Sequence, residues 1–338
     1  MKGILVSLML VVSVSVYAQD PHFSQFFASP LTLNPAYTGK FDGTFRVAGN
    51  YRNQWPTINN AFTTATASVD FAILRNRIPE FDTWGVGVMA VNDRSANKVL
   101  NNNFISVSTA YHKALDENGY HTITVGFQGT YANKRLDIMK LTFEDMLRID
   151  GFTGTTREDF VNNPNDNIPI NYFDVNAGLL YSGSTNGYNN FYMGASTYHI
   201  NRPKESFTGG NYILDQRFTL HGGGYVPIGR TTTFHGSFIY QSQAGASETV
   251  LGGAVAFSLS DDEDVATNLY GGLWYRFGDA FIPYVGLEYS GFRLGYSYDI
   301  NNSSLRTASN SRGGNEISLI FVKKPADPYR RRMACPKF

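Results

Sequence analysis

Residues 121–133, HTITVGFQGTYAN, alternate between apolar and polar side chains, and this alternation decides the fold class. Ile123, Val125, Phe127 and Tyr131 fall at every second position, and threonine and glutamine fall between them. Because successive side chains of a β-strand point to opposite faces, one face of this segment is apolar and the other is polar. Such a strand suits a wall with lipid on one side and a polar interior on the other.

The same period of two recurs along the chain, for example in residues 44–52, 105–112 and 292–299. In the last of these, Arg293 and Asp299 alternate with aromatic and aliphatic side chains. A small dry core has no place for charged groups in that pattern, whereas the wall of a membrane barrel does.

Segments of ~9–13 residues with this pattern give about 14 candidate strands. The sequence therefore predicts an all-β, transmembrane antiparallel β-barrel over residues 44–323. Its expected strand starts are Thr44, Ala61, Asp82, Asn102, His121, Asn171, Asn190, Ile213, Thr231, Ser247, Thr267, Phe281, Gly291 and Gly314. Short connections such as 116–119 and long ones such as 135–169 indicate periplasmic turns and external loops, with both barrel ends on the periplasmic side. One or two soluble β-sandwiches are the alternative.

Composition agrees with a barrel and excludes several classes of function. The 338 residues include 21 Tyr, 25 Phe and 33 Gly, and only 17% are charged, against roughly 25% in soluble domains. A net charge of zero argues against nucleic-acid binding. The single cysteine excludes an internal disulfide framework, and no H-E-x-x-H, G-x-S-x-G or P-loop motif is present. We predict no catalytic, metal or cofactor site, and hence a protein that is not an enzyme.

The N-terminus has the features of an export signal. A basic start is followed by the apolar run 4–16, and Val16 and Ala18 occupy the −3 and −1 positions of a signal-peptidase site. The run is shorter than the ~20 residues that span a bilayer, which disfavours an uncleaved anchor. We therefore expect residues 1–18 to be a cleaved signal peptide.

The segment 19–39, QDPHFSQFFASPLTLNPAYTG, resembles the opening of the PorP/SprF family of type IX secretion-system membrane proteins. Later motifs are similar too, namely 274–276 (WYR) with 279–280 (DA), 295–300 (GYSYDI) and the ending 335–338 (CPKF). One departure is Asn315, which stands where the family usually has histidine.

This resemblance implies a non-enzymatic protein of the bacterial outer membrane, in the Bacteroidota, that takes part in type IX secretion or gliding motility. Such a protein anchors or positions either the periplasmic ring of the machinery or a large secreted adhesin at the cell surface. The alternative is an outer-membrane porin or specific diffusion channel. The sequence does not separate these roles.

The segment 19–43 precedes the first expected strand and is too apolar for a free periplasmic tail. We predict that it packs inside the barrel as a plug or docks a partner, and each buried apolar side chain would contribute roughly 1.5–3 kcal/mol. The residues proposed for this role are Phe23, Phe26, Phe27, Leu31, Asn34 and Pro35.

Residues 324–338 form a basic extension beyond the last expected strand. We predict a periplasmic tail in which Arg330, Arg331, Arg332 and Cys335 dock a partner, the alternative being a solvated end. Cys335, an unpaired exported thiol, either forms an intermolecular bond or is simply tolerated.

Overall fold

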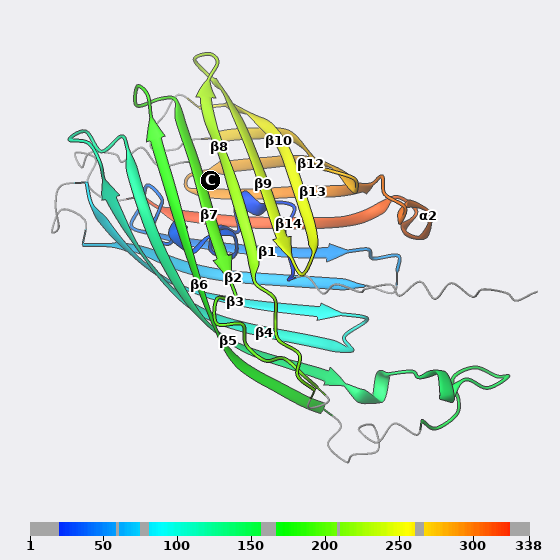
Figure 1. The fold of residues 1–338 in the computed structure, drawn as a ribbon. Coiled ribbons are helices and arrows are strands. Elements are labelled where there is room, and N and C mark those ends of the chain that lie inside the picture. The colour runs from blue at the N-terminus through cyan, green and yellow to red at the C-terminus, as the bar shows by residue number, and fades with distance from the viewer. Residues whose placement is uncertain are drawn as a thin grey trace, which may run out of the picture.

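A computed structural model describes residues 20–58, 61–74, 81–156, 167–207, 210–260 and 267–324, and in it fourteen antiparallel strands form a closed barrel (Figure 1). The strands are β1 (Phe45–Gln54), β2 (Phe62–Ile73), β3 (Thr83–Ser95), β4 (Leu100–Ala114), β5 (Thr122–Asp137), β6 (Asn167–Ser184), β7 (Asn190–Tyr198), β8 (Arg217–Pro227), β9 (Thr232–Gln243), β10 (Ala246–Ser258), β11 (Thr267–Arg276), β12 (Ala280–Tyr289), β13 (Phe292–Asn301) and β14 (Arg312–Lys323).

Each strand pairs with its neighbours in sequence, and β1 pairs with β14 to close the sheet. The closing register runs from Phe45 opposite Lys323 to Gln54 opposite Gly314. The predicted barrel of about 14 strands is confirmed. Its expected strand starts lie within two residues of the observed ones, except at β6 and β8, where they differ by four.

Burial in this barrel is the reverse of that in a soluble protein. Along β5 the polar residues Thr122, Thr124 and Gln128 are buried toward the lumen, whereas Val125 and Phe127 face outward and are 41% and 55% exposed. An outer surface of exposed apolar side chains is what lipid requires, and a lumen of paired polar groups can be hydrogen-bonded.

Aromatic side chains gather near both ends of the outer wall. At one end Phe45 lies against Phe71 and Phe321, with ring centroids 6.0 and 5.9 Å apart, across the β1–β14 closure. At the other end Trp55 packs against Phe62 at 5.6 Å. These two aromatic belts mark the membrane–water interfaces of a β-barrel.

The two ends of the barrel differ in their connections. At the end where β1 starts and β14 finishes, which we call the periplasmic end, the connections are short. The opposite, external end carries the longest connections, 138–166, 199–216 and 302–311, although three of its turns, including 244–245, are tight. Two 3₁₀ turns, η3 (Ile138–Lys140) and η4 (Glu144–Met146), lie in the longest connection, and α2 (Arg306–Ser309) lies before β14. None of the helices in the described ranges is long and apolar enough to cross a membrane.

Candidate functional site

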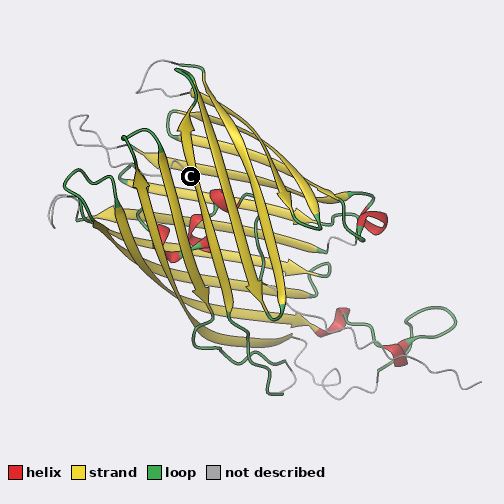
Figure 2. Ribbon diagram, turned by 45° about the horizontal axis from the view of Figure 1, so that its top comes forward, coloured by secondary structure: helices red, strands yellow, loops and turns green. Residues whose placement is uncertain are grey.

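Residues 20–42, which we call the lumen segment, lie inside the barrel (Figures 1 and 2). They form three short turns, η1 (Phe26–Ala28), α1 (Pro30–Leu33) and η2 (Pro35–Tyr37). Prolines 30 and 35 begin the second and third turns, where a missing N–H costs nothing. The segment starts beside the external ends of β7 and β8 and joins β1 at the periplasmic end, so it crosses the whole lumen.

Charged groups hold the first described residue at the external end. The carboxylate of Asp20 accepts from His199 Nε2 at 2.6 Å and lies 3.2 Å from Arg217 Nη1. His199 Nδ1 lies 3.0 Å from Asp174 Oδ2, so the imidazole bridges two carboxylates. Burial alone would lower the pKa of His199, but the charge of Asp20, together with the hydrogen bonds of Asp174 and Asp20, raises it to about 9. Burial likewise opposes ionisation of Asp20, yet the His199 and Arg217 charges hold the pKa of that carboxyl well below its usual range.

A buried polar network holds Ser24 and Gln25 in place. The Ser24 hydroxyl donates to the Asp299 carboxylate at 2.8 Å and accepts from Arg276 Nη2 at 2.7 Å. The backbone N–H groups of Ser24 and Gln25 donate to the Glu316 carboxylate at 2.8 and 3.2 Å. Arg276 also lies 2.9 Å from Asp299, and Arg52 pairs with the same carboxylate at 3.1 Å. Strands β11, β13 and β14 thus hold one point of the lumen segment.

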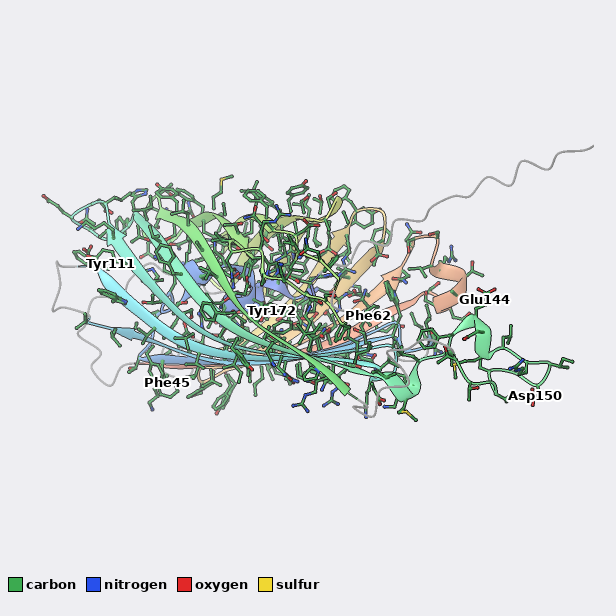
Figure 3. The ribbon with its side chains drawn as sticks, turned by 60° about the horizontal axis from the view of Figure 1, so that its bottom comes forward. Phe45, Phe62, Tyr111, Glu144, Asp150 and Tyr172 are labelled. Carbon is green, nitrogen blue, oxygen red and sulfur yellow. The ribbon has the colours of Figure 1, made fainter. Side chains whose placement is uncertain are left out.

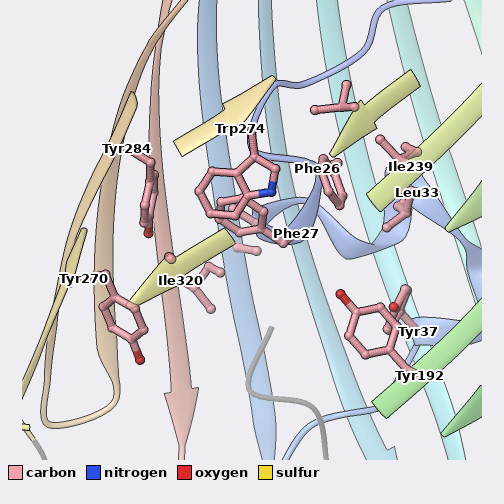
Figure 4. Close-up of a cluster of buried hydrophobic side chains, with 14 of the residues drawn as sticks. Phe26, Phe27, Leu33, Tyr37, Tyr192, Ile239, Tyr270, Trp274, Tyr284 and Ile320 are labelled. Carbon is pink, nitrogen blue, oxygen red and sulfur yellow. The ribbon is translucent and has the colours of Figure 1, made fainter. Parts of the chain in front are cut away.

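An aromatic cluster follows this network (Figure 4). The Phe27 ring lies 4.8 Å from the Trp274 ring and 5.3 Å, edge to face, from Tyr284. Trp274 is 2% exposed, and its indole N–H donates to Ser237 at 3.0 Å. Aromatic packing of this kind contributes about 0.5–1.5 kcal/mol beyond the area buried.

Asn34 is the most completely bonded residue of the lumen segment. Its Oδ1 accepts from the backbone N–H of Ala36 at 2.8 Å, which caps η2. Its Nδ2 donates to the backbone carbonyls of Leu179 and Ala195 at 3.0 and 3.2 Å, and lies 3.0 Å from His221 Nε2. A small amide therefore connects the segment to β6, β7 and β8.

Two glycines of the wall make room for the lumen segment, one at Asn34 and the other at Thr38. An ideal Cβ at Gly178 would lie 1.9 Å from Asn34 Oδ1, and one at Gly85 would lie 1.9 Å from the Thr38 carbonyl oxygen. Both distances are far below van der Waals contact, so the Asn34 side chain and the Thr38 backbone approach the sheet at positions that only glycine permits. The wall and the lumen segment are complementary in shape.

The periplasmic end of the segment is bonded as firmly. The Gly39 N–H donates to Asp70 Oδ2 at 2.8 Å, and Asp70 is also paired with Arg46 at 2.8 Å. Lys40 Nζ donates to the Thr122 hydroxyl at 2.6 Å. Contacts from strands around the barrel thus continue to the point where the chain enters β1.

The structure places the predicted plug residues together inside the barrel. Phe23, Phe26 and Phe27 are 5–6% exposed, and Leu31 and Asn34 are 1% and 0% exposed. Pro35, also buried, begins η2. The predicted docking residues of the C-terminal tail, Arg330, Arg331, Arg332 and Cys335, lie outside the described residues, as does the signal segment.

Sequence reasoning missed the partners of the lumen segment. Arg276 and Asp299 belong to the late motifs quoted above, and the structure brings both to Ser24 at the N-terminal motif. Glu316, which accepts from the Ser24 N–H, directly follows Asn315, and we assigned no role to either residue from the sequence. Charged residues at lumen-facing positions of alternating strands were the available signal, but it does not say which segment they bind.

The contacts at this site are of the kind that hold a segment in place. Among the described residues no group of three or more His, Cys, Asp or Glu is placed to hold a metal ion. The Ser24 hydroxyl is held between Asp299 and Arg276, and no histidine hydrogen bond to it is present among the described contacts. The arrangement immobilises the lumen segment.

Comparison with solved structures confirms the architecture. The fold is similar to the toluene transporter TbuX of Ralstonia pickettii, with a TM-score of 0.50 and 7% identity over 87% of this chain and 92% of that chain. It is also similar to the toluene transporter TodX of Pseudomonas putida, with a TM-score of 0.49 and 9% identity over 90% of this chain and 94% of that one. No curated protein matches the sequence.

The sequence profile of one family covers most of the chain. The profile of the type IX secretion system membrane protein family PorP/SprF matches residues 15–321. This range includes the lumen segment and extends into β14. With its closed barrel and lipid-facing outer wall, the chain is an outer-membrane protein, and it belongs to the PorP/SprF family of type IX secretion system membrane proteins.

Proposed function

We propose that this barrel is a non-enzymatic scaffold of the type IX secretion machinery, which anchors or positions a secreted surface adhesin or the periplasmic ring. The observation that carries the proposal is the lumen segment, which crosses the lumen and is bonded at its start through Asp20, in its middle through Asn34 and at its end through Gly39. A segment held in this way is a fixed part of the barrel. A filled lumen hinders the passage of a solute but leaves both ends of the barrel free to bind a protein partner.

The division of the chain belongs to the same proposal. Residues 1–18 are a cleaved signal, residues 19–43 fill the lumen, and residues 324–338 leave the barrel at the periplasmic end. The cluster Arg330–Arg332 in that tail is a docking element for an acidic periplasmic surface.

A diffusion channel is the second candidate, because the barrel shares its fold with TbuX, a toluene transporter. Planar-bilayer conductance separates the two roles. The scaffold predicts that the whole chain conducts few ions and that a variant lacking residues 20–39 conducts more. A whole chain that conducts steadily supports the channel.

Affinity purification tests the scaffold directly. The tagged protein is extracted from outer membranes in mild detergent, and proteins that co-purify are identified by mass spectrometry. Recovery of one large surface adhesin indicates a dedicated secretion partner, and recovery of periplasmic ring subunits indicates the core machinery. A protein that is recovered alone and conducts ions contradicts the proposal.

A further inference from the structure

The connection between β5 and β6 projects beyond the external end of the barrel (Figure 3). We call its described part, residues 138–156, the external finger. The finger is carried by the two longest strands, of 16 and 18 residues, whereas the next strand, β7, has 9. In Figure 3, Glu144 and Asp150 lie on a segment that extends past the ends of the other strands.

Hydrogen bonds within the finger itself give it a defined local structure. Arg148 and Gly151 form an isolated β-bridge, with N···O distances of 2.6 and 3.1 Å, and the Gly154 N–H donates to the Met146 carbonyl at 2.9 Å. The Thr153 hydroxyl donates to Asp150 at 2.9 Å. These bonds shape a tight hairpin, so its tip presents side chains in a fixed arrangement.

That tip is apolar and exposed. Leu147 and Phe152 are 55% and 53% exposed, and Ile149 at the end of the hairpin is completely exposed. Met139 at the base is 73% exposed. Exposed apolar side chains grouped on a hydrogen-bonded loop mark an interaction site.

Lipid does not explain this surface. The outward face of β5 and β6 has its last aromatic pair at Tyr131 and Phe173, and beyond that pair it carries Asn133, Arg135 and Asn171. The finger begins seven residues after Tyr131, roughly 20 Å farther along the strand. Its apolar tip is therefore separated from the lipid-facing wall by a polar stretch.

The charge around the tip defines the partner. Glu144 and Asp150 are exposed beside the apolar residues. The described residues 138–156 contain three acidic and two basic residues; of the basic ones, Lys140 is paired with Asp137 at 2.7 Å and Arg148 lies in the tip itself. An apolar tip that carries the exposed carboxylates of Glu144 and Asp150 is complementary to an apolar pocket with basic groups at its rim.

We propose that the external finger is the site at which a protein partner outside the cell is held, through a partner pocket that is apolar inside and bordered by lysine or arginine. The proposal rests on the proposed function, and it assigns the holding of that partner to the finger. Leu147, Ile149 and Phe152 fill the pocket, and Glu144 and Asp150 pair with its rim.

Cysteine labelling tests this site without knowledge of the partner. The chain has one cysteine, so Ile149→Cys is made in a Cys335→Ser background. Ser304→Cys, exposed in the external connection before α2, is the matched control. Both are labelled with a membrane-impermeant maleimide in purified barrels, in bilayers containing lipopolysaccharide, and in intact cells.

We expect equal labelling of both positions in the purified and bilayer samples. In cells, Ile149→Cys should react about tenfold more slowly than the control, as for a site left free in roughly one molecule of ten. Adding Glu144→Lys and Asp150→Lys should restore fast labelling. Fast labelling of Ile149→Cys in cells, protection by lipid alone, or protection that survives charge reversal would each overturn the proposal.

The two proposals fail in different ways. If affinity purification recovers a secretion component while Ile149→Cys is labelled quickly in cells, the scaffold stands and the finger is not its site. If the whole chain conducts ions and co-purifies with nothing, the scaffold itself is wrong, whatever the labelling shows.

Discussion

The side-chain oxygen of Asn34 occupies the space in which a side chain at Gly178 would begin. The distance from Oδ1 to an ideal Cβ at that glycine is 1.9 Å. The lumen segment and strand β6 are thus fitted to each other at atomic contact, and this fit makes the segment a stable part of the barrel.

Replacing Gly178 by alanine should displace Asn34 and weaken its bonds to β6, β7 and β8. Forcing a methyl group into packed space costs about 1–3 kcal/mol. We expect the free energy of unfolding by urea in lipid vesicles to fall by that amount, which moves the midpoint to a lower urea concentration. Gly271→Ala, at a position with no atom within 4 Å of the new Cβ, is the control and should leave the midpoint unchanged. Equal effects of the two changes would contradict the close fit.

Replacing Arg276 by methionine should strongly destabilise the barrel, because Asp299 and Glu248 would lose a buried partner. Breaking a buried pair from one side costs about 3–5 kcal/mol. Arg202→Met removes an ion pair with Asp215 that is about half exposed, and should cost about 0–1 kcal/mol. The free energy of unfolding by urea compares the two variants. A small loss for Arg276→Met would show that the network contributes little.

Replacing Phe27 by alanine should open a cavity between Trp274 and Tyr284. Loss of a buried phenylalanine costs about 3–5 kcal/mol, and Phe27→Leu should recover a large part of it. The Trp274 indole should become accessible to acrylamide, which quenches its fluorescence. Phe27→Ala without added quenching would mean that the ring does not shield Trp274.

Raising the pH should loosen the external end of the lumen segment. The pKa of His199 is raised from 6.5 to about 9 by Asp20 and Asp174, so its charged form stabilises the folded barrel. That contribution is complete below pH 6.5 and disappears as the pH rises through 9. We expect the free energy of unfolding to fall by on the order of 2–3 kcal/mol between pH 7 and pH 10.

A His199→Gln variant is the control for this pH effect. It keeps a hydrogen-bonding side chain but does not titrate, so its stability should change less over the same range. The carboxyl of Asp20, with its lowered pKa, contributes above its ordinary range and loses that contribution only in strong acid. An identical pH profile for both proteins would exclude His199 as the group responsible.

The wall of the barrel was predictable from the sequence, because a single physical rule governs it. In every strand that faces lipid, apolar and polar side chains must alternate. This alternation in 121–133 is visible without any knowledge of the neighbouring strands. The errors lie at β6, which begins four residues earlier than expected and includes Pro169, a residue uncommon inside strands, and at β8, which begins four residues later because Ile213 and Leu214 belong to the preceding connection. There the alternation no longer separates a strand from a loop.

The contacts of the lumen segment were only partly predictable. Phe23, Phe26, Phe27 and Leu31 stand out because exposed apolar residues before a strand need cover. Their partners are distant in the sequence: Trp274 lies 247 residues after Phe27, and Met89 and Val91, which cluster with Leu31, lie 58 and 60 residues after it. Which arginine pairs with which carboxylate depends on the register and the tilt of the strands, and neither can be predicted from local sequence.

The path of the lumen segment constrains the order of biogenesis. Ser24 and Gln25 precede the first strand, yet Asp299 and Glu316, which hold them, lie on β13 and β14, the last two strands of the barrel. The sheet closes when β14 meets β1, and the lumen segment is bonded on both sides of this closure, to Asp70 on β2 and to Glu316 on β14. The lumen segment can therefore complete its contacts only when the last two strands are in place, so the closing of the barrel and the seating of the segment that precedes it are coupled.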